Sequence, residues 1–172
     1  MIDRPVFGID AAFTAGKKSD FFAAVGGHWD TEGKIRIFEV HRHRRGLVEA
    51  IRNLSLLRER FPGCQFASYV SGQEVGIFHH IAETTGIAVH LIPARWNKAV
   101  RAQKAVRSWV SGDILVRSAQ PWTGAYLAEL HAFDGREDGV DDQVDATVSL
   151  HDFMMMNRPQ RGDFWTAGRR VA

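Results

Sequence analysis

The chain has 172 residues, of which 45% are apolar and 24% charged, a composition typical of one soluble domain with a hydrophobic core. Its net charge of +2 does not by itself indicate nucleic-acid binding, and no apolar run approaches the roughly 20 residues of a membrane span. The single cysteine, Cys64, excludes an internal disulfide and favours a reducing compartment.

The first part of the chain predicts three strands and a helix. The strands are expected over residues 5–10, 20–29 and 34–42. The first is a buried apolar run that ends in Asp10, and the other two are joined by the hairpin turn signal Asp30-Thr31-Glu32-Gly33. A helix is expected from Gly46 to about Arg60, because apolar residues recur at helical spacing up to Pro62-Gly63.

The rest of the chain alternates strands and helices. Further strands are expected over residues 64–70, 87–92 and 114–117, and further helices over 73–84, 97–110, 122–133 and 141–156. A hairpin followed by such units predicts an α/β fold, in which helices flank a mixed sheet made of an antiparallel hairpin and parallel strands. We expect one domain over residues 1–157, followed by a basic polar tail over 158–172.

Four aspartates are the main candidates for chemistry. Asp141, Asp142 and Asp145 open the last predicted helix, and positions 142 and 145 share one face of it. Carboxylates this close repel and raise each other's pKa, so a cation between them is expected. Mg²⁺ prefers such oxygen ligands, although Asp141 or Asp142 could instead serve as a plain helix cap. The first strand is expected at the centre of the sheet, which would bring Asp10 to the same crevice.

Several segments in a fixed order carry a resemblance to a known family. They are Gly8-Ile9-Asp10, Asp20, Ser71-Gly72-Gln73-Glu74, Lys98 with Arg101, Gly112-Asp113-Ile114-Leu115-Val116, Pro121-Trp122, Glu129-Leu130 with Phe133, and Asp141 to Ala146. With this order the chain resembles, from about Val6 to Phe153, the C-terminal nuclease domain of the large terminase subunit of tailed bacteriophages. That domain has the RNase H/RuvC-like fold.

The resemblance implies an endonuclease that cuts concatemeric double-stranded viral DNA in the cytoplasm of the bacterial host. It implies Mg²⁺ or Mn²⁺, two ions, with Asp10 bridging them and Asp142 supplying the C-terminal ligand beside Asp141 or Asp145. The catalytic residues would be Asp10, Asp142 and Asp145. Implied partners are the terminase ATPase domain, the portal and the small terminase subunit, with no membrane.

One position departs from the family pattern. An acid is usual at the end of the fourth strand, where this chain has Ala67 and Ser68. Either Glu74 or Asp20 substitutes for it, or one metal site is weak, or the nuclease is impaired. The sequence leaves these three interpretations open.

Basic residues suggest where DNA would bind. Lys98, Arg101 and Lys104 recur along one helix face, so they are candidates for phosphate contacts, although a solvated face is an equal alternative. Lys17 and Lys18 lie in a loop that lacks the first glycine of a nucleotide-binding phosphate loop, so we expect them near DNA rather than ATP. The nearest alternatives to a terminase nuclease are a Holliday-junction resolvase or a catalytically impaired DNA-binding or docking module.

Overall fold

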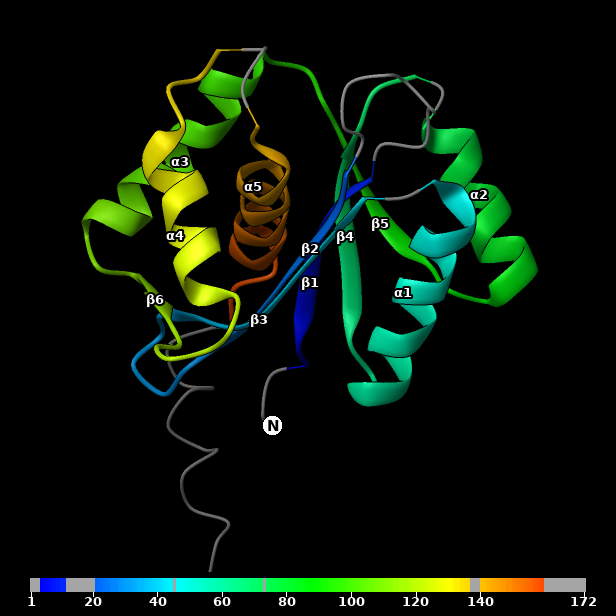
Figure 1. The fold of residues 1–172 in the computed structure, drawn as a ribbon, viewed down its shortest axis with the longest axis horizontal. Helices are drawn as coiled ribbons and strands as arrows, with labels where there is room; N and C mark the ends of the chain where they lie inside the picture. The colour runs from blue at the N-terminus through cyan, green and yellow to red at the C-terminus, as the bar shows by residue number, and fades with distance from the viewer. Residues whose placement is uncertain (1–3, 12–20, 45, 73, 137–139, 160–172) are drawn as a thin grey trace, which may run out of the picture.

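A computed structural model describes residues 4–11, 21–44, 46–72, 74–136 and 140–159, and the expected tail lies almost wholly outside these ranges. Six strands of this described part form one mixed sheet in the order β5-β4-β1-β2-β3-β6 (Figure 1). Their bounds are β1 Val6–Ala11, β2 Phe21–Trp29, β3 Ile35–Arg44, β4 Gln65–Val70, β5 Val89–Pro93 and β6 Ile114–Val116. Strands β1, β2 and β3 pair antiparallel, and the pairs β1–β4, β4–β5 and β3–β6 are parallel.

Helices cover both faces of the sheet. Figure 1 shows α1 and α2 on one side, and α5 against the other side with α3 and α4 beyond it. Their bounds are α1 Leu47–Arg60, α2 Glu74–Thr85, α3 Lys98–Val110, α4 Thr123–Ala132 and α5 Asp142–Met156. None of the helices in the described ranges is long and apolar enough to cross a membrane.

The predicted fold class and element order are confirmed, with small differences at the ends. Strand β3 continues to Arg44, because its pairing with β2 runs as far as the Phe21–Arg44 pair. Strand β5 begins at Val89 rather than residue 87. The Thr85 hydroxyl accepts a hydrogen bond from the Ile87 amide at 3.1 Å, and the pairing of β5 with β4 begins only at Val89.

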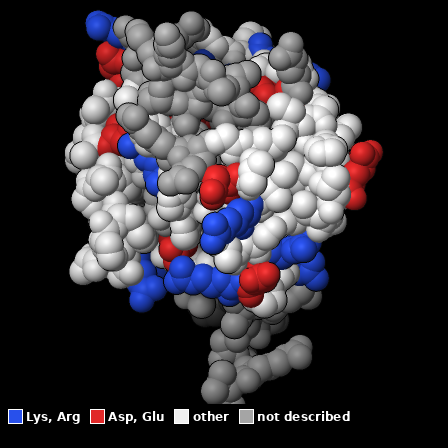
Figure 2. Space-filling view, turned by 45° about the vertical axis from the view of Figure 1, so that its right-hand side comes forward, with Lys and Arg blue, Asp and Glu red and all other residues white. Residues whose placement is uncertain are grey.

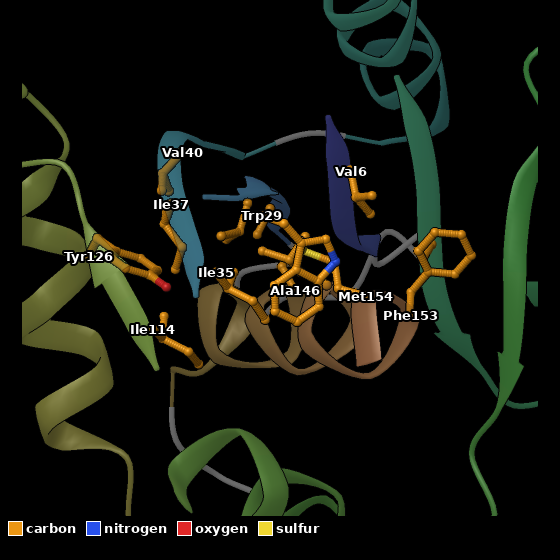
Figure 3. Packing of buried hydrophobic residues seen from close by; sticks show 14 of the residues in the cluster. Val6, Trp29, Ile35, Ile37, Val40, Ile114, Tyr126, Ala146, Phe153 and Met154 are labelled. Atoms are coloured by element: carbon orange, nitrogen blue, oxygen red, sulfur yellow. The ribbon is translucent and has the colours of Figure 1, made fainter. Parts of the chain in front are cut away.

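The sheet separates two hydrophobic layers, and the layer under α5 positions the site. Its side chains gather between the strands and α5 (Figure 3), and they include Val25, Ile37, Tyr126, Leu150 and Phe153. Ten residues of α5 are buried, so this helix is a central element rather than a surface one.

Gly8 sets the closest approach between β1 and α5. A Cβ atom on this residue would lie 1.9 Å from the Ala146 carbonyl oxygen and 2.4 Å from the Leu150 nitrogen. Only glycine leaves room for two backbones at this separation. Asp10, two residues further along β1, is therefore brought to the first turn of α5.

Candidate functional site

The site is built on the carboxyl end of β1 and the amino end of α5. Asp10 ends the apolar run of the central strand. Burial, followed by the negative charges of Asp145 and Asp142, raises its pKa well above the usual value. Asp10, Asp141, Asp142 and Asp145 all contribute to this electrostatic cluster, hereafter the acid cluster, so the structure brings the four predicted aspartates together.

Lys98 binds one side of the acid cluster. Its ammonium nitrogen lies 2.7 Å from Asp141 Oδ2 and 2.8 Å from Asp145 Oδ2, and Arg101 Nη2 is 3.6 Å from Asp145 Oδ1. Burial lowers the pKa of Lys98, but the two carboxylates outweigh this effect and the pKa is raised. Burial also raises the pKa of Asp145, even though Lys98 acts in the opposite direction.

Arg42 binds the other side of the acid cluster. Its Nη2 atom donates to Asp142 Oδ2 at 3.2 Å, and its Nε atom lies 3.6 Å from Glu129 Oε2. Glu129 is buried and accepts a 2.6 Å hydrogen bond from the Gln143 amide at the start of α5. Burial raises the pKa of Asp142, and the hydrogen bond from Arg42 only partly offsets it. Glu129 therefore ties α4 and β3 to the first turn of α5.

Strand β4 presents a tyrosine at the level of Asp10. Gly8 pairs with Ala67 and Ile9 with Ser68, so the next step of this parallel register places Tyr69 beside Asp10. Tyr69, rather than Ala67 or Ser68, is thus the β4 residue at the level of Asp10. The Tyr69 hydroxyl donates to Asp152 on α5, and the Arg101 guanidinium lies 5.0 Å from the centre of its ring.

The other candidate residues divide into two groups. Glu74 does not join the acid cluster, because its Oε2 atom accepts hydrogen bonds from the Ser71 amide and, at 3.1 Å, from the Ser71 hydroxyl. This is the capping-box arrangement of a helix start. Lys104 is exposed on α3. Asp20, Lys17 and Lys18 lie outside the described residues.

Arg42 and the network around Asp152 were not among the predicted site residues. Asp152 accepts from the Tyr69 hydroxyl and lies 2.8 Å from His151 Nδ1, and His151 Nε2 is 3.0 Å from Ser108 Oγ. A signal existed for Asp152, because it follows Asp145 by seven residues and so falls on the same helix face. No spacing rule could pair Arg42 with Asp142, because the two residues are 100 positions apart in the sequence.

The chemistry of the acid cluster suits a hard divalent cation, since carboxylate oxygens are the ligands that Mg²⁺ and Mn²⁺ prefer. The present side-chain arrangement does not yet form such a site. Within the described ranges, no group of three or more His, Cys, Asp or Glu side chains is arranged to hold one ion. The carboxylates instead form ion pairs with Lys98 and Arg42. The residue types therefore suit a divalent cation, but the positions of their oxygen atoms do not match its coordination geometry.

Comparisons with known proteins identify the fold. No family model matches the sequence. No curated protein is significantly similar to it. The crystal structure of the large terminase nuclease from thermophilic phage G20c with bound zinc matches with a TM-score of 0.67 at 18% identity, over 87% of this chain and 81% of that one. The same nuclease with bound magnesium gives 0.63 at 17% identity, over 87% and 81% of the two chains.

A yeast mitochondrial Holliday junction resolvase matches with a TM-score of 0.53 at 12% identity, over 96% of this chain and 86% of that one. At these identities the similarity concerns the fold. The strand order and the helices on both faces of the sheet agree with it. The chain therefore has the RNase H-like nuclease fold that is found in the large terminase nuclease.

Proposed function

We propose that this protein is the metal-dependent endonuclease domain of a phage DNA-packaging terminase, which cuts double-stranded concatemeric DNA in the bacterial cytoplasm. The observation that supports this most is the meeting of Asp10 with Asp142 and Asp145 at the end of the central strand. These carboxylates come from opposite ends of the sequence and converge on a fold shared with a terminase nuclease. That nuclease has been crystallised with zinc, cobalt and magnesium.

In this proposal Asp10, Asp142 and Asp145 hold Mg²⁺ or Mn²⁺, with Asp141 beside them. A bound divalent ion would supply an activated water and stabilise the charge on the leaving oxygen. The protein would provide the ligands and their orientation. Arg42, which lies beside the buried Glu129, donates to Asp142 and would help to orient its carboxylate for an ion.

The proposed substrate contacts are made by basic side chains around the acid cluster. Lys98 and Arg101 lie within it, Lys104 continues the same helix, and Lys17 with Lys18 follow β1 in the sequence, outside the described residues. Such contacts to phosphates position a duplex without reading its sequence. The ATPase domain, the portal and the small terminase subunit are the proposed partners, as the resemblance implies.

The test is cleavage of supercoiled plasmid by the purified protein in Mn²⁺, Mg²⁺ or EDTA. We expect nicking and linearisation with either metal, none in EDTA, and none with Asp10→Asn or Asp142→Asn, because each variant removes a ligand charge. Asp113→Asn is the control, since Asp113 is exposed and its side chain lies outside the acid cluster. Full activity of both Asp10→Asn and Asp142→Asn would refute the proposal.

A resolvase-type nuclease is the second candidate, and the similarity to the yeast mitochondrial enzyme favours it. The same preparation should be tested on a four-way DNA junction and on linear duplex of equal length. Strong preference for the junction would support the resolvase. Equal cleavage would support the terminase.

An impaired DNA-binding module is the third candidate, because the resemblance implies an acid near the end of β4 and the residue that the register places beside Asp10 is Tyr69. This candidate predicts duplex binding without cleavage by the folded protein. Tyr69→Asp would then be the variant expected to restore activity, ahead of a change at Ala67 or Ser68.

A further inference from the structure

We propose that Lys98 is a built-in cation of the acid cluster, so that the site takes one divalent ion rather than the expected two. The inference rests on the proposed function, because it concerns how many ions that nuclease site binds. It begins from the position of the ammonium group, which lies between Asp141 and Asp145 at 2.7 and 2.8 Å. These are the distances of charge-assisted hydrogen bonds.

Helix α3, which carries Lys98, is capped and packed against α5. Lys98 is the first residue of α3, and the Asn97 side chain caps this helix by accepting a 3.0 Å hydrogen bond from the Val100 amide. Helix α3 is fixed to α5 by a buried cluster that contains Ala102, Ala105, Val144 and Val148. The side chain of Lys98 is only 22% exposed. The backbone that carries Lys98 is therefore held by packing, and its ammonium group is held by the two carboxylates.

The ligands available for a second ion are few. On the β4 side of Asp10 the neighbouring residue is Tyr69, a neutral group whose hydroxyl already donates to Asp152. On the α5 side, Lys98 already neutralises Asp141 and Asp145. A second divalent ion would have to share these two carboxylates with an ammonium a few ångströms away, which is electrostatically unfavourable.

Lys98 can still contact the phosphate backbone of DNA in this arrangement. A lysine ammonium has three N–H donors, and the two carboxylates use two of them. The third can donate to a non-bridging phosphate oxygen. Lys98 would thereby supply, as a fixed monovalent cation, part of the charge neutralisation that a second ion would otherwise provide.

The experiment counts bound ions without relying on activity. Mn²⁺ is titrated into the wild type, Lys98→Met and Lys104→Met, and the stoichiometry and Kd are measured by calorimetry and by Mn²⁺ electron paramagnetic resonance. Methionine keeps an unbranched chain and removes the charge. Lys104→Met is the matched control, because Lys104 is an exposed residue of the same helix.

We expect one Mn²⁺ per chain for the wild type and Lys104→Met. For Lys98→Met we expect either a second ion or about tenfold tighter binding of the first. Two ions in the wild type, or one ion with equal Kd in the wild type and Lys98→Met, would overturn this inference while leaving the proposed function intact. No Mn²⁺ bound by any of the folded proteins would overturn both. If Lys98→Met does not fold, Lys98→Gln replaces it, and the wild-type count alone still decides between one and two ions.

Discussion

The carboxylate of Asp10 is held where its negative charge is unfavourable. Burial and the neighbouring aspartates raise its pKa, so folding favours the protonated form. Between the pKa of the unfolded chain, about 4, and the higher folded value, the folded state binds more protons than the unfolded state. The stability of the metal-free protein should therefore fall as the pH rises above about 4 through the raised pKa of Asp10.

The first prediction concerns Asp10→Asn in EDTA. Asparagine has the same shape without the charge, so the variant should melt a few degrees higher than the wild type at pH 8. The difference should disappear near pH 3, where Asp10 is protonated in both states. Thermal unfolding over a pH series measures this, and a lower melting temperature of the variant at pH 8 would contradict the argument.

The second prediction concerns Tyr69→Phe. Burial raises the pKa of Asp152, but the hydrogen bonds from His151 and Tyr69 outweigh it and the pKa is lowered. Loss of the hydroxyl should cost about 1.5–3 kcal/mol at pH 7, the usual contribution of a hydrogen bond to a charged group. Because a lowered pKa stabilises the fold above about pH 4, the loss should shrink as the pH falls below that value. Urea unfolding at pH 7 and pH 3 tests both statements.

At the scale of elements, the approach of β1 to α5 decides whether the site forms. Gly8→Ala should destabilise the protein by about 3 kcal/mol or more, because its Cβ would meet the backbone of α5 and the core has little space to adjust. Gly76→Ala is the control, since nothing lies within 4 Å of its Cβ position in α2. That change should be neutral or stabilise by up to about 1 kcal/mol. Equal effects in denaturant unfolding would contradict the role of Gly8.

Helix α3 leads to a prediction about DNA. Lys98 and Arg101 are paired with carboxylates, whereas Lys104 is exposed on the same helix. Lys104→Gln should therefore lower the slope of log K against log salt concentration by about 0.9, the contribution of one phosphate contact. Arg52→Gln, an exposed residue of α1 across the sheet, should leave the slope unchanged. Binding is measured in EDTA by fluorescence anisotropy, and equal slopes would remove Lys104 from the interface.

The elements were predictable because apolar periodicity is local, whereas the site depends on register and distance. The strand that carries Tyr69 was expected over residues 64–70. A shift of a single residue exchanges the two faces of a strand. The residue of this strand that lies beside Asp10 could therefore be identified only from the observed pairing. The link from Arg42 to Asp142 joins residues that no spacing rule relates.

At the scale of the whole molecule, the sheet separates the acid cluster from the layer of α1 and α2. On the face shown in Figure 2, basic and acidic side chains of the described residues lie beside one another among uncharged ones, and the basic side chains drawn there form no single extended area. Attraction of DNA on that face would thus come from individual contacts rather than from a broad field.

Because the two layers are separate, a core mutation under α1 and Mn²⁺ binding at the acid cluster should have additive effects on the free energy of unfolding. Leu54→Ala, in the core under α1, should cost about 2–5 kcal/mol. Mn²⁺ at about 100 times its Kd should then add about 2.7 kcal/mol to the wild type and to Leu54→Ala alike. It should add nothing to Asp10→Asn. Unfolding with and without Mn²⁺ measures the increments, and a smaller increment in Leu54→Ala would show that the two layers are coupled.

The acid cluster joins the first strand of the sheet to the last helix of the described chain. A ribosome must therefore translate Asp10 well over a hundred codons before it reaches Asp145. An interrupted translation product that ends before α5 would carry Asp10 without its partners. If the site is a nuclease, such a fragment could not cut the DNA of the cell that makes it, and cutting would begin only after synthesis had passed the last ligand.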